Sequence, residues 1–320
     1  MATPARAAGK LTPVKAYLQM ARIDHWTKNV FVIPGFLVAL WIDPGQWRRL
    51  DAATCLAGLL AICIVTSSNY VLNEILDARS DSFHPYKSGR PAVTGQVRPW
   101  LAYAEWLFLF AAALALGWMV SARFTLTLLG LWLAGCLYNV PPIRTKDVPY
   151  LDVLSEGLMN PLRLLAGWHL TKTAAVPITF LLLSYWMAGC YFMAIKRFAE
   201  FRELPAEDLR RYRKTFRRYS EKNLLTSILF YGALTMLFLG AFIVRYRLEL
   251  ILSFPLVVLV MALYFRLAFR RNSPVQHPEG LFREPSIVLP VLACAIVMAV
   301  LLFVDVPLLH RIFQPTAAGS

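Results

Sequence analysis

Acidic and amide side chains gather at the end of one long apolar stretch. Residues 73–81 read NEILDARSD. At about 100° per residue, Asn73, Asp77 and Asp81 fall on one stripe of a helix. Glu74 lies beside that stripe. Carboxylates at a membrane edge repel one another unless a cation neutralises them, and Mg²⁺ binds carboxylate oxygens together with substrate phosphates. The pattern predicts a magnesium site for a diphosphate, and an acidic helix end in solvent is the alternative.

A second acidic pair lies within YLDVLSEGLMNPLR, residues 150–163. Asp152 and Glu156 are four residues apart, and Arg163 follows seven residues later, near the same helix face. Two acidic groups on one membrane side suit two ions on opposite sides of a bridging diphosphate. The expected metal ligands are Asn73, Glu74, Asp77, Asp81, Asp152 and Glu156, and the expected catalytic residues among them are Asp77, Asp81 and Asp152.

Basic and amide residues lie close to these acids in sequence. Guanidinium and ammonium groups bind phosphate oxygens that a metal leaves uncovered. Each cation alone is more typical of an anchor to anionic lipid, but their clustering in the loops that carry the acids shifts the balance toward substrate binding. The candidate substrate-binding residues are Lys28, Asn29, Lys87, Arg90, Tyr138, Arg144, Lys146, Arg163, Lys196 and Arg197.

The elements that must position these residues are membrane helices. The chain is 58% hydrophobic and only 16% charged, which is outside the range of ordinary soluble domains. Apolar stretches of about 20 residues span a bilayer as helices. We expect an all-α polytopic membrane protein with about nine transmembrane helices around a polar cavity that opens to the cytoplasmic side. The predicted spans are 26–42, 50–72, 99–119, 124–138, 150–170, 177–197, 224–244, 248–269 and 286–305.

The segments outside the spans complete the domain organisation. Residues 1–25 are predicted to form an amphipathic interfacial segment, 26–305 a single transmembrane domain, and 306–320 a mobile tail. The cytoplasmic loops are expected at about 73–98, 139–149, 198–222 and 270–285. For the third of these loops, the sequence favours a surface helix on anionic lipid over a lid above the site.

The distribution of Lys and Arg sets the orientation. Most of these 33 residues lie in the N-terminal segment and in the loops on its side of the spans, which predicts that the N-terminus and the acids face the cytoplasm. We expect an integral cell-membrane protein, typical of a bacterial inner membrane. The net charge of +14 is explained by membrane lipids, because the cations flank the spans, and no nucleic-acid partner is expected.

The motifs resemble those of the UbiA superfamily of intramembrane prenyltransferases. NEILDARSD is similar to that family's NDxxDxxxD, with Glu74 in place of the first Asp. HPYKSGRPAVTG is similar to the stretch leading to its RP-x-x-x-G turn, and YNVPPIRTKD to its Tyr-Pro-Pro segment. Asp152 to Glu156 resembles its DxxxD with a longer second acid. The resemblance implies nine helices, Mg²⁺, a diphosphate donor and a polyprenyl lipid substrate.

Finer similarities point to one branch. ARIDHWTKNVFVIP, HPYKSGRP and AIKRFAEFRE followed by RRYS resemble the polyprenyl-phosphate phosphoribosyltransferases, whose donor is phosphoribosyl diphosphate and whose acceptor is a lipid phosphate. Prenyl transfer to an aromatic acceptor such as 4-hydroxybenzoate is the alternative, with Asp152 as the proton acceptor. A membrane transporter is the alternative of another class, because intramembrane acids also mark ion pathways.

Overall fold

The computed structural model describes residues 12–83, 87–276, 280–281 and 284–313, and every regular element within these ranges is a helix. The all-α prediction is therefore confirmed for the described part of the chain. The predicted mobile end at 314–320, the first eleven residues of the interfacial segment and His84, which closely follows the acidic stripe, lie outside the described residues.

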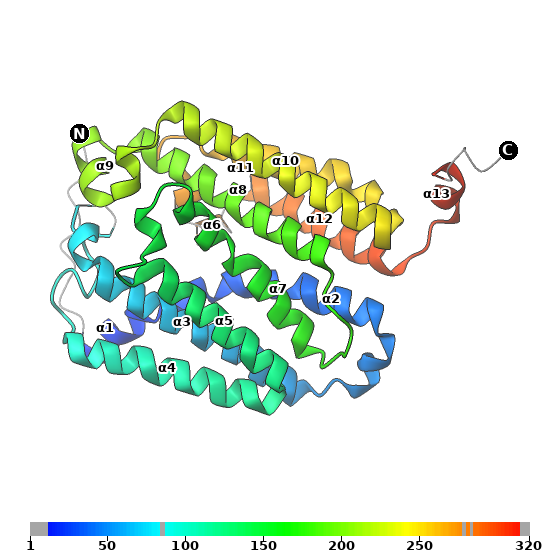
Figure 1. Ribbon diagram of the computed structural model, residues 1–320, viewed down its shortest axis with the longest axis horizontal. Helices are drawn as coiled ribbons and strands as arrows, with labels where there is room; N and C mark the ends of the chain where they lie inside the picture. Colours follow the sequence, from blue (N-terminus) through cyan, green and yellow to red (C-terminus); the bar gives the residue numbers. More distant parts are fainter. Residues whose placement is uncertain (1–11, 84–86, 277–279, 282–283, 314–320) are drawn as a thin grey trace.

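Six helices are long and apolar enough to cross a membrane, and they run nearly parallel along the molecule (Figure 1). Their presence makes the chain an integral membrane protein. They are α3 (Ala52–Asp81), α4 (Pro99–Val120), α8 (Thr179–Glu203), α10 (Glu221–Tyr246), α12 (Pro285–Phe303) and the stretch Leu248–Leu267, made of η5 (Leu248–Ser253) and α11 (Phe254–Leu267).

The other three predicted spans are also helical, but two of them change geometry midway. The first is η1 (Ile23–Val32) followed by α2 (Ile33–Ile42), the fourth is α5 (Ala122–Asn139), and the fifth is α6 (Leu151–Gly157) followed by α7 (Met159–Leu170). Pro161 explains the break in the fifth, because it cannot donate a hydrogen bond to the carbonyl of Gly157 and its ring crowds that carbonyl.

Short elements cap the two ends of the bundle (Figure 1). The helix α1 is only eight residues long, so the described part of the predicted interfacial segment is a short helix followed by η1. The short elements are α1 (Pro13–Met20), η2 (Pro44–Arg49), η3 (Thr145–Asp147), α9 (Ala206–Tyr212), η4 (Lys214–Arg217), η6 (Pro274–Gln276) and α13 (Pro307–Ile312).

Close backbone contact joins α2 to α7. A Cβ atom on Gly35 would lie 1.9 Å from the carbonyl oxygen of Leu164, and one on Gly167 would lie 2.0 Å from that of Val32. Glycine is therefore required at both positions for the two helices to approach this closely. The contact fixes α7, which carries Arg163, against the N-terminal helices.

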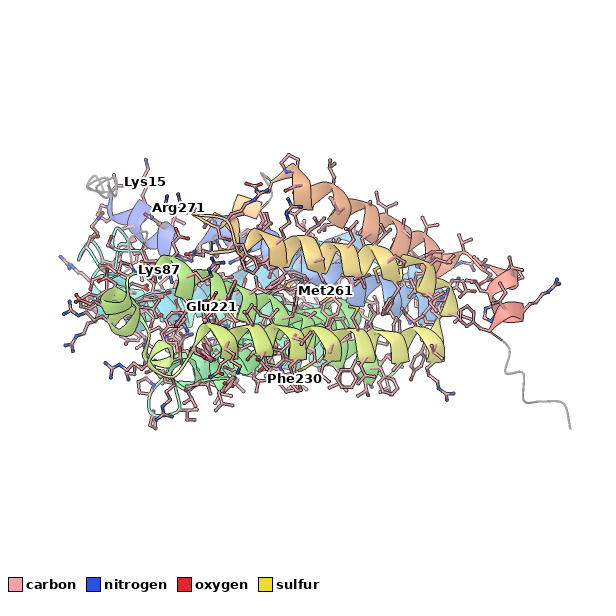
Figure 2. All side chains as sticks on the ribbon, turned by 90° about the horizontal axis from the view of Figure 1, so that it is seen from above. Lys15, Lys87, Glu221, Phe230, Met261 and Arg271 are labelled. Atoms are coloured by element: carbon pink, nitrogen blue, oxygen red, sulfur yellow. The ribbon has the colours of Figure 1, made fainter. Side chains whose placement is uncertain are left out.

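The connections after α3, α5 and α8 meet at one end of the bundle. Lys87 donates a hydrogen bond to the hydroxyl of Tyr212, and Lys214 forms an ion pair with Asp147 at 2.8 Å. In Figure 2, Lys15, Lys87 and Arg271 lie toward this end, and Phe230 and Met261 lie near the middle of the bundle. Charged side chains are thus concentrated where the loops converge, and α13 lies at the opposite end (Figure 1).

Candidate functional site

The last turns of α3 present the predicted acidic stripe to the converging loops. Asn73 donates from Nδ2 to Oδ1 of Asn139 at 2.6 Å. One turn later, Oδ1 of Asp77 lies 2.8 Å from Nη2 of Arg144 and 2.6 Å from Nζ of Lys146. Asn73 and Asp77 therefore share one face of α3, as their spacing predicts, and that face meets the connection between α5 and α6.

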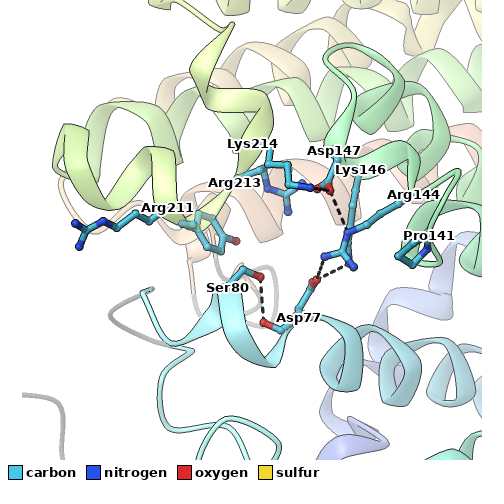
Figure 3. A pocket seen from close by; sticks show the side chains of 10 residues that line it. Asp77, Ser80, Pro141, Arg144, Lys146, Asp147, Arg211, Arg213 and Lys214 are labelled. Atoms are coloured by element: carbon cyan, nitrogen blue, oxygen red, sulfur yellow. Dashed lines mark hydrogen bonds and ion pairs between the residues drawn. The ribbon is translucent and has the colours of Figure 1, made fainter.

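A cavity of about 240 Å³ opens beside Asp77 (Figure 3). Five of its ten lining residues are cations and two are acids, so the cavity suits a polyanion. In Figure 3 the side chain of Arg211 points away from the group around Asp77. The lining residues are Asp77, Ser80, Pro141, Arg144, Lys146, Asp147, Arg211, Tyr212, Arg213 and Lys214.

Arg144 is held in place by a strained backbone and by several partners. Its φ is +27°, in a region that non-glycine residues rarely adopt, and such strain is maintained only where the surroundings impose it. Nε of Arg144 lies 3.3 Å from Oδ2 of Asp147, and Nη1 donates to the carbonyl of Asn139 at 3.3 Å. The guanidinium is thereby fixed between two acids at the cavity wall.

Lys146 points back into the protein from the same connection. Nζ donates to Oδ1 of Asn139 at 2.6 Å, and its side chain is only 4% exposed. Burial lowers the pKa of Lys146 to about 8, although the Asp77 carboxylate opposes this shift. The ammonium of Lys146 therefore loses its proton more easily than that of an ordinary lysine.

Asp81 and Glu74 have partners that differ from those of Asp77. Asp81 forms an ion pair with Arg90, and its Oδ1 lies 4.0 Å from Nζ of Lys87. Burial lowers the pKa of Lys87 to about 8, against the effect of Asp81. Glu74 is 2% exposed and accepts from the backbone N–H of Ala92 at 3.3 Å. Glu74 therefore packs against the residues after Arg90 and does not line the cavity.

Asp152 is fully buried, and both of its oxygens are engaged. Oδ1 accepts from the hydroxyl of Tyr219 at 2.6 Å, and Oδ2 accepts from Nε of Arg197 at 3.1 Å. Arg197 also donates to Oε2 of Glu200 at 3.0 Å and to the hydroxyl of Tyr138 at 3.2 Å. Asp152, the first acid of the second motif, is thus part of a buried ion-pair network.

A further polar group lies deeper in the bundle. Arg163 donates from Nε to Oδ1 of Asn29 at 3.2 Å and from Nη1 to Oδ1 of Asn160 at 3.3 Å. Glu156 interacts electrostatically with Tyr70 and Tyr138, and within the described ranges its carboxylate forms no hydrogen bond or ion pair. These contacts bring Asn29 and Arg163 together as a polar group inside the bundle.

Lysines from three distant segments converge near this group. Nζ of Lys28, in η1, lies 5.8 Å from the ring centroid of Tyr70. Lys196, in α8, interacts electrostatically with Lys28, Lys87 and Glu200. Positive charge from η1, the loop after α3, and α8 is therefore brought to one part of the interior.

The structure adds site residues that the sequence reasoning did not single out. They are Asn139, Glu200, Tyr212, Arg213 and Tyr219. Two of them, Tyr212 and Arg213, line the cavity from the loop that the sequence favoured as a lipid-surface helix. A signal was available in that loop, because RRYRKTFRRY combines tyrosines with many basic residues, a composition suited to binding anions as well as lipid.

The fold and the cationic, acid-containing cavity define a polytopic membrane protein with a site for a polyanion. The chain belongs to the UbiA prenyltransferase family, whose model matches residues 31–283. The expectation of a UbiA-type transferase is thereby confirmed at the level of the family.

Relatives with assigned activities include two kinds of enzyme. Decaprenyl-phosphate phosphoribosyltransferase of Mycolicibacterium smegmatis is 27% identical over 66% of this chain and 64% of its own length, and that of Mycobacterium tuberculosis is 30% identical over 58% and 60%. Protoheme IX farnesyltransferase of Xanthomonas euvesicatoria is 28% identical over 45% and 50%. The chain thus matches less than two thirds of the length of these relatives.

Solved structures share the fold. A UbiA homologue from Archaeoglobus fulgidus, bound to DMAPP and Mg²⁺, superimposes with a TM-score of 0.65 over 89% of this chain and 99% of its own, at 20% identity. A digeranylgeranylglyceryl phosphate synthase gives a TM-score of 0.60 over 91% and 96%, at 17% identity. The similarity extends across nearly all of the helical bundle.

Proposed function

We propose that this chain transfers a phosphoribosyl group from phosphoribosyl diphosphate to a polyprenyl phosphate. The observation that carries the proposal is the cavity beside Asp77, in which cations outnumber acids by five to two. Decaprenyl-phosphate phosphoribosyltransferases among the relatives support this choice.

The number of phosphate groups favours phosphoribosyl transfer over prenyl transfer. A phosphoribosyl donor carries a diphosphate and a separate 5-phosphate, and its lipid acceptor carries another phosphate, whereas a prenyl diphosphate with an aromatic acceptor carries one diphosphate only. Two groups of cations are available. The outer group is Arg144, Lys146 and Arg213, and the inner group is Lys28 and Lys196. Lys87 lies between them and interacts electrostatically with Arg213 and with Lys196. Two separate cationic groups match a reaction with separate phosphates.

The residues near Asp77 fit a magnesium ion whose coordination shell is completed by the substrate. Both cations that bind Asp77 contact Oδ1, and Oδ2 accepts no hydrogen bond in the part of the chain that the structure describes. No three acidic, histidine or cysteine side chains gather into a metal-type cluster within the described residues. Mg²⁺ commonly takes one or two carboxylates and completes its shell with water and phosphates, so Asp77, with Asp81 and Asn73 one turn away on either side, would hold it.

Bound there, Mg²⁺ would neutralise charge on the diphosphate as it leaves the ribose carbon. The protein supplies the remaining contacts. Arg144 and Lys146 would bind oxygens of the diphosphate, and Arg90 and Lys87 would bind those nearest Asp81. Burial raises the pKa of Tyr212 to about 12, which keeps its hydroxyl protonated as a hydrogen-bond donor. The lipid acceptor is already an ionised phosphate, so no residue is needed as a base.

The arrangement in the membrane is part of the proposal. We assign nine spans, six long helices together with η1–α2, α5 and α6–α7, with the loop end of the bundle and the N-terminus facing the cytoplasm. The excess of Lys and Arg at this end supports that orientation. A water-soluble donor would then enter from the cytoplasm, and the polyprenyl chain would lie among the apolar helices.

Prenyl transfer remains the second candidate, since the structural neighbour from Archaeoglobus fulgidus binds DMAPP and Mg²⁺. The deciding experiment gives purified full-length protein both substrate pairs with Mg²⁺: phosphoribosyl diphosphate with polyprenyl phosphate, and polyprenyl diphosphate with 4-hydroxybenzoate. A ribosylated lipid supports the proposal. A prenylated ring without ribosylated lipid would replace it with the second candidate.

A further inference from the structure

Asp152 lies where the sequence predicts a metal ligand, but its surroundings are those of a buried ion pair. Its exposure is 0%. Tyr219 occupies Oδ1, and Arg197 occupies Oδ2, with Nη1 of Arg213 3.9 Å from the same oxygen. Asp77 differs, because both of its cations contact one oxygen, Oδ1, and the residue lines the cavity.

We infer that Asp152 is a positioning residue that holds Arg213 at the cavity wall, and that Arg213 is a further phosphate-binding residue. The inference rests on the proposed function for the identity of the phosphate. Nη1 of Arg213 donates to the hydroxyl of Tyr138 at 3.3 Å, and that hydroxyl also accepts from Arg197. Tyr138 thereby links the two guanidinium groups, and Asp152 supplies the negative charge beside both.

Charge balance in this network opposes a divalent ion. Two acids, Asp152 and Glu200, face two arginines, Arg197 and Arg213, and all but Arg213 are at most 2% exposed. A divalent cation at Asp152 would have to displace a buried guanidinium from its carboxylate. Breaking a buried ion pair leaves an uncompensated charge and is strongly unfavourable.

The same acid anchors the segment that carries Arg213. The hydroxyl of Tyr219, just before α10, donates to Asp152 and accepts from the backbone N–H of Tyr150 at 2.7 Å. The segment between α8 and α10 is therefore fastened to α6 through one carboxylate. Removal of that charge would free Arg213 from its position and leave Asp77 and its partners in place.

The test separates binding of the anion from binding of the metal. Asp152→Asn and wild-type protein are purified in detergent and titrated with inorganic diphosphate in the presence of EDTA. In a separate titration without EDTA, Mn²⁺ is the metal probe, and bound Mn²⁺ is counted by electron paramagnetic resonance. We expect Asp152→Asn to weaken diphosphate binding about tenfold or more and to change Mn²⁺ affinity by less than about twofold. Glu284→Gln, in an exposed ion pair with Arg270, is the matched control.

Asp77→Asn should show the opposite pattern, with loss of bound Mn²⁺. Loss of one Mn²⁺ per chain in Asp152→Asn, or no change in diphosphate affinity, would overturn the inference. Arg213→Gln and Tyr138→Phe decide the matter if Asp152→Asn does not fold, since both should weaken diphosphate binding and spare Mn²⁺. Wild-type protein that binds diphosphate but forms no ribosylated lipid would refute the proposed function and leave the positioning role of Asp152 standing.

Discussion

Alkaline pH should inactivate the enzyme through two lysines. Burial gives both Lys87 and Lys146 a pKa of about 8, well below the usual 10.5. Both would bind phosphate in the protonated form only. At pH 9 about one tenth of each remains protonated, so if both are required kcat/KM for the donor should fall to about one hundredth of its value near neutral pH.

Arginine replacements identify the groups responsible. Arginine keeps its charge throughout this range, so Lys146→Arg and Lys87→Arg should each reduce the alkaline slope of log kcat/KM against pH by about one. Each variant is expected to have a higher KM at every pH because a guanidinium fits these sites differently, and the slope is therefore the informative quantity. Radiolabelled donor and a lipid-extraction assay from pH 6.5 to 9.5 provide the profile.

Folding stability should move in the other direction. Between pH 8 and 10.5 the unfolded chain binds more protons at Lys87 and Lys146 than the folded chain does, so these two groups make the fold more stable as pH rises through that window. A melting temperature that is unchanged or higher at pH 9 would exclude unfolding as the cause of lost activity. A flat wild-type profile to pH 9.5, or an unchanged slope in Lys146→Arg, would refute the reasoning.

Three further outcomes are expected. Gly35→Ala should lower the melting temperature in a thermal-shift assay, because its Cβ would meet the Leu164 carbonyl. Overpacking of this kind should reduce the free energy of unfolding by roughly 1–3 kcal/mol or more. Gly240→Ala, whose Cβ meets nothing within 4 Å, should be neutral or stabilising, and equal behaviour of the two variants would contradict the α2–α7 contact. Asn139→Ala removes the acceptor for Lys146 and Asn73 and should raise the donor KM about tenfold with little effect on kcat; an unchanged KM would argue against a role in binding. In wild-type protein, Mg²⁺ and diphosphate should each strengthen the binding of the other by the same factor. Calorimetric titration should find this coupling lost in Asp77→Asn, and full activity of that variant would remove Asp77 from the metal site.

Local periodicity predicted the part of the site that lies on one helix. The spacing of Asn73 and Asp77 determines that they share a face of α3, because the helix has 3.6 residues per turn. Arg144 and Lys146 come from a single short connection, and Arg144 lies 67 residues beyond Asp77. Their convergence on Asp77 was expected because both segments were predicted to lie on the same side of the membrane. Periodicity could not decide the direction of Glu74, which depends on how residues 90–92 fold back along α3.

Long-range partners lay beyond the reach of the sequence pattern. Asp152 meets Tyr219 and Arg213, which are more than 60 residues away and follow a different helix. Spacing in YLDVLSEG is equally compatible with a metal ligand and with a buried counterion. Only the packing of the 204–220 segment against α6 distinguishes the two. The same limit applies to the fifth span, where hydropathy does not reveal how far Pro161 interrupts the helix.

Pairing between acids and cations explains how a chain of this kind keeps charges near a membrane before substrate arrives. An isolated carboxylate at this depth would be costly, but Asp77 is 13% exposed and bound to two cations. In the proposed reaction, Arg144 and Lys146 would bind phosphate oxygens and leave Asp77 free to hold the metal. Asp77, Arg144 and Lys146 would then each have a partner before and after binding. The cavity has more cations than acids, and the phosphates of the substrate would balance this excess of positive charge. Asp152 already contacts two arginines and a tyrosine, so it would keep the same partners when substrate binds.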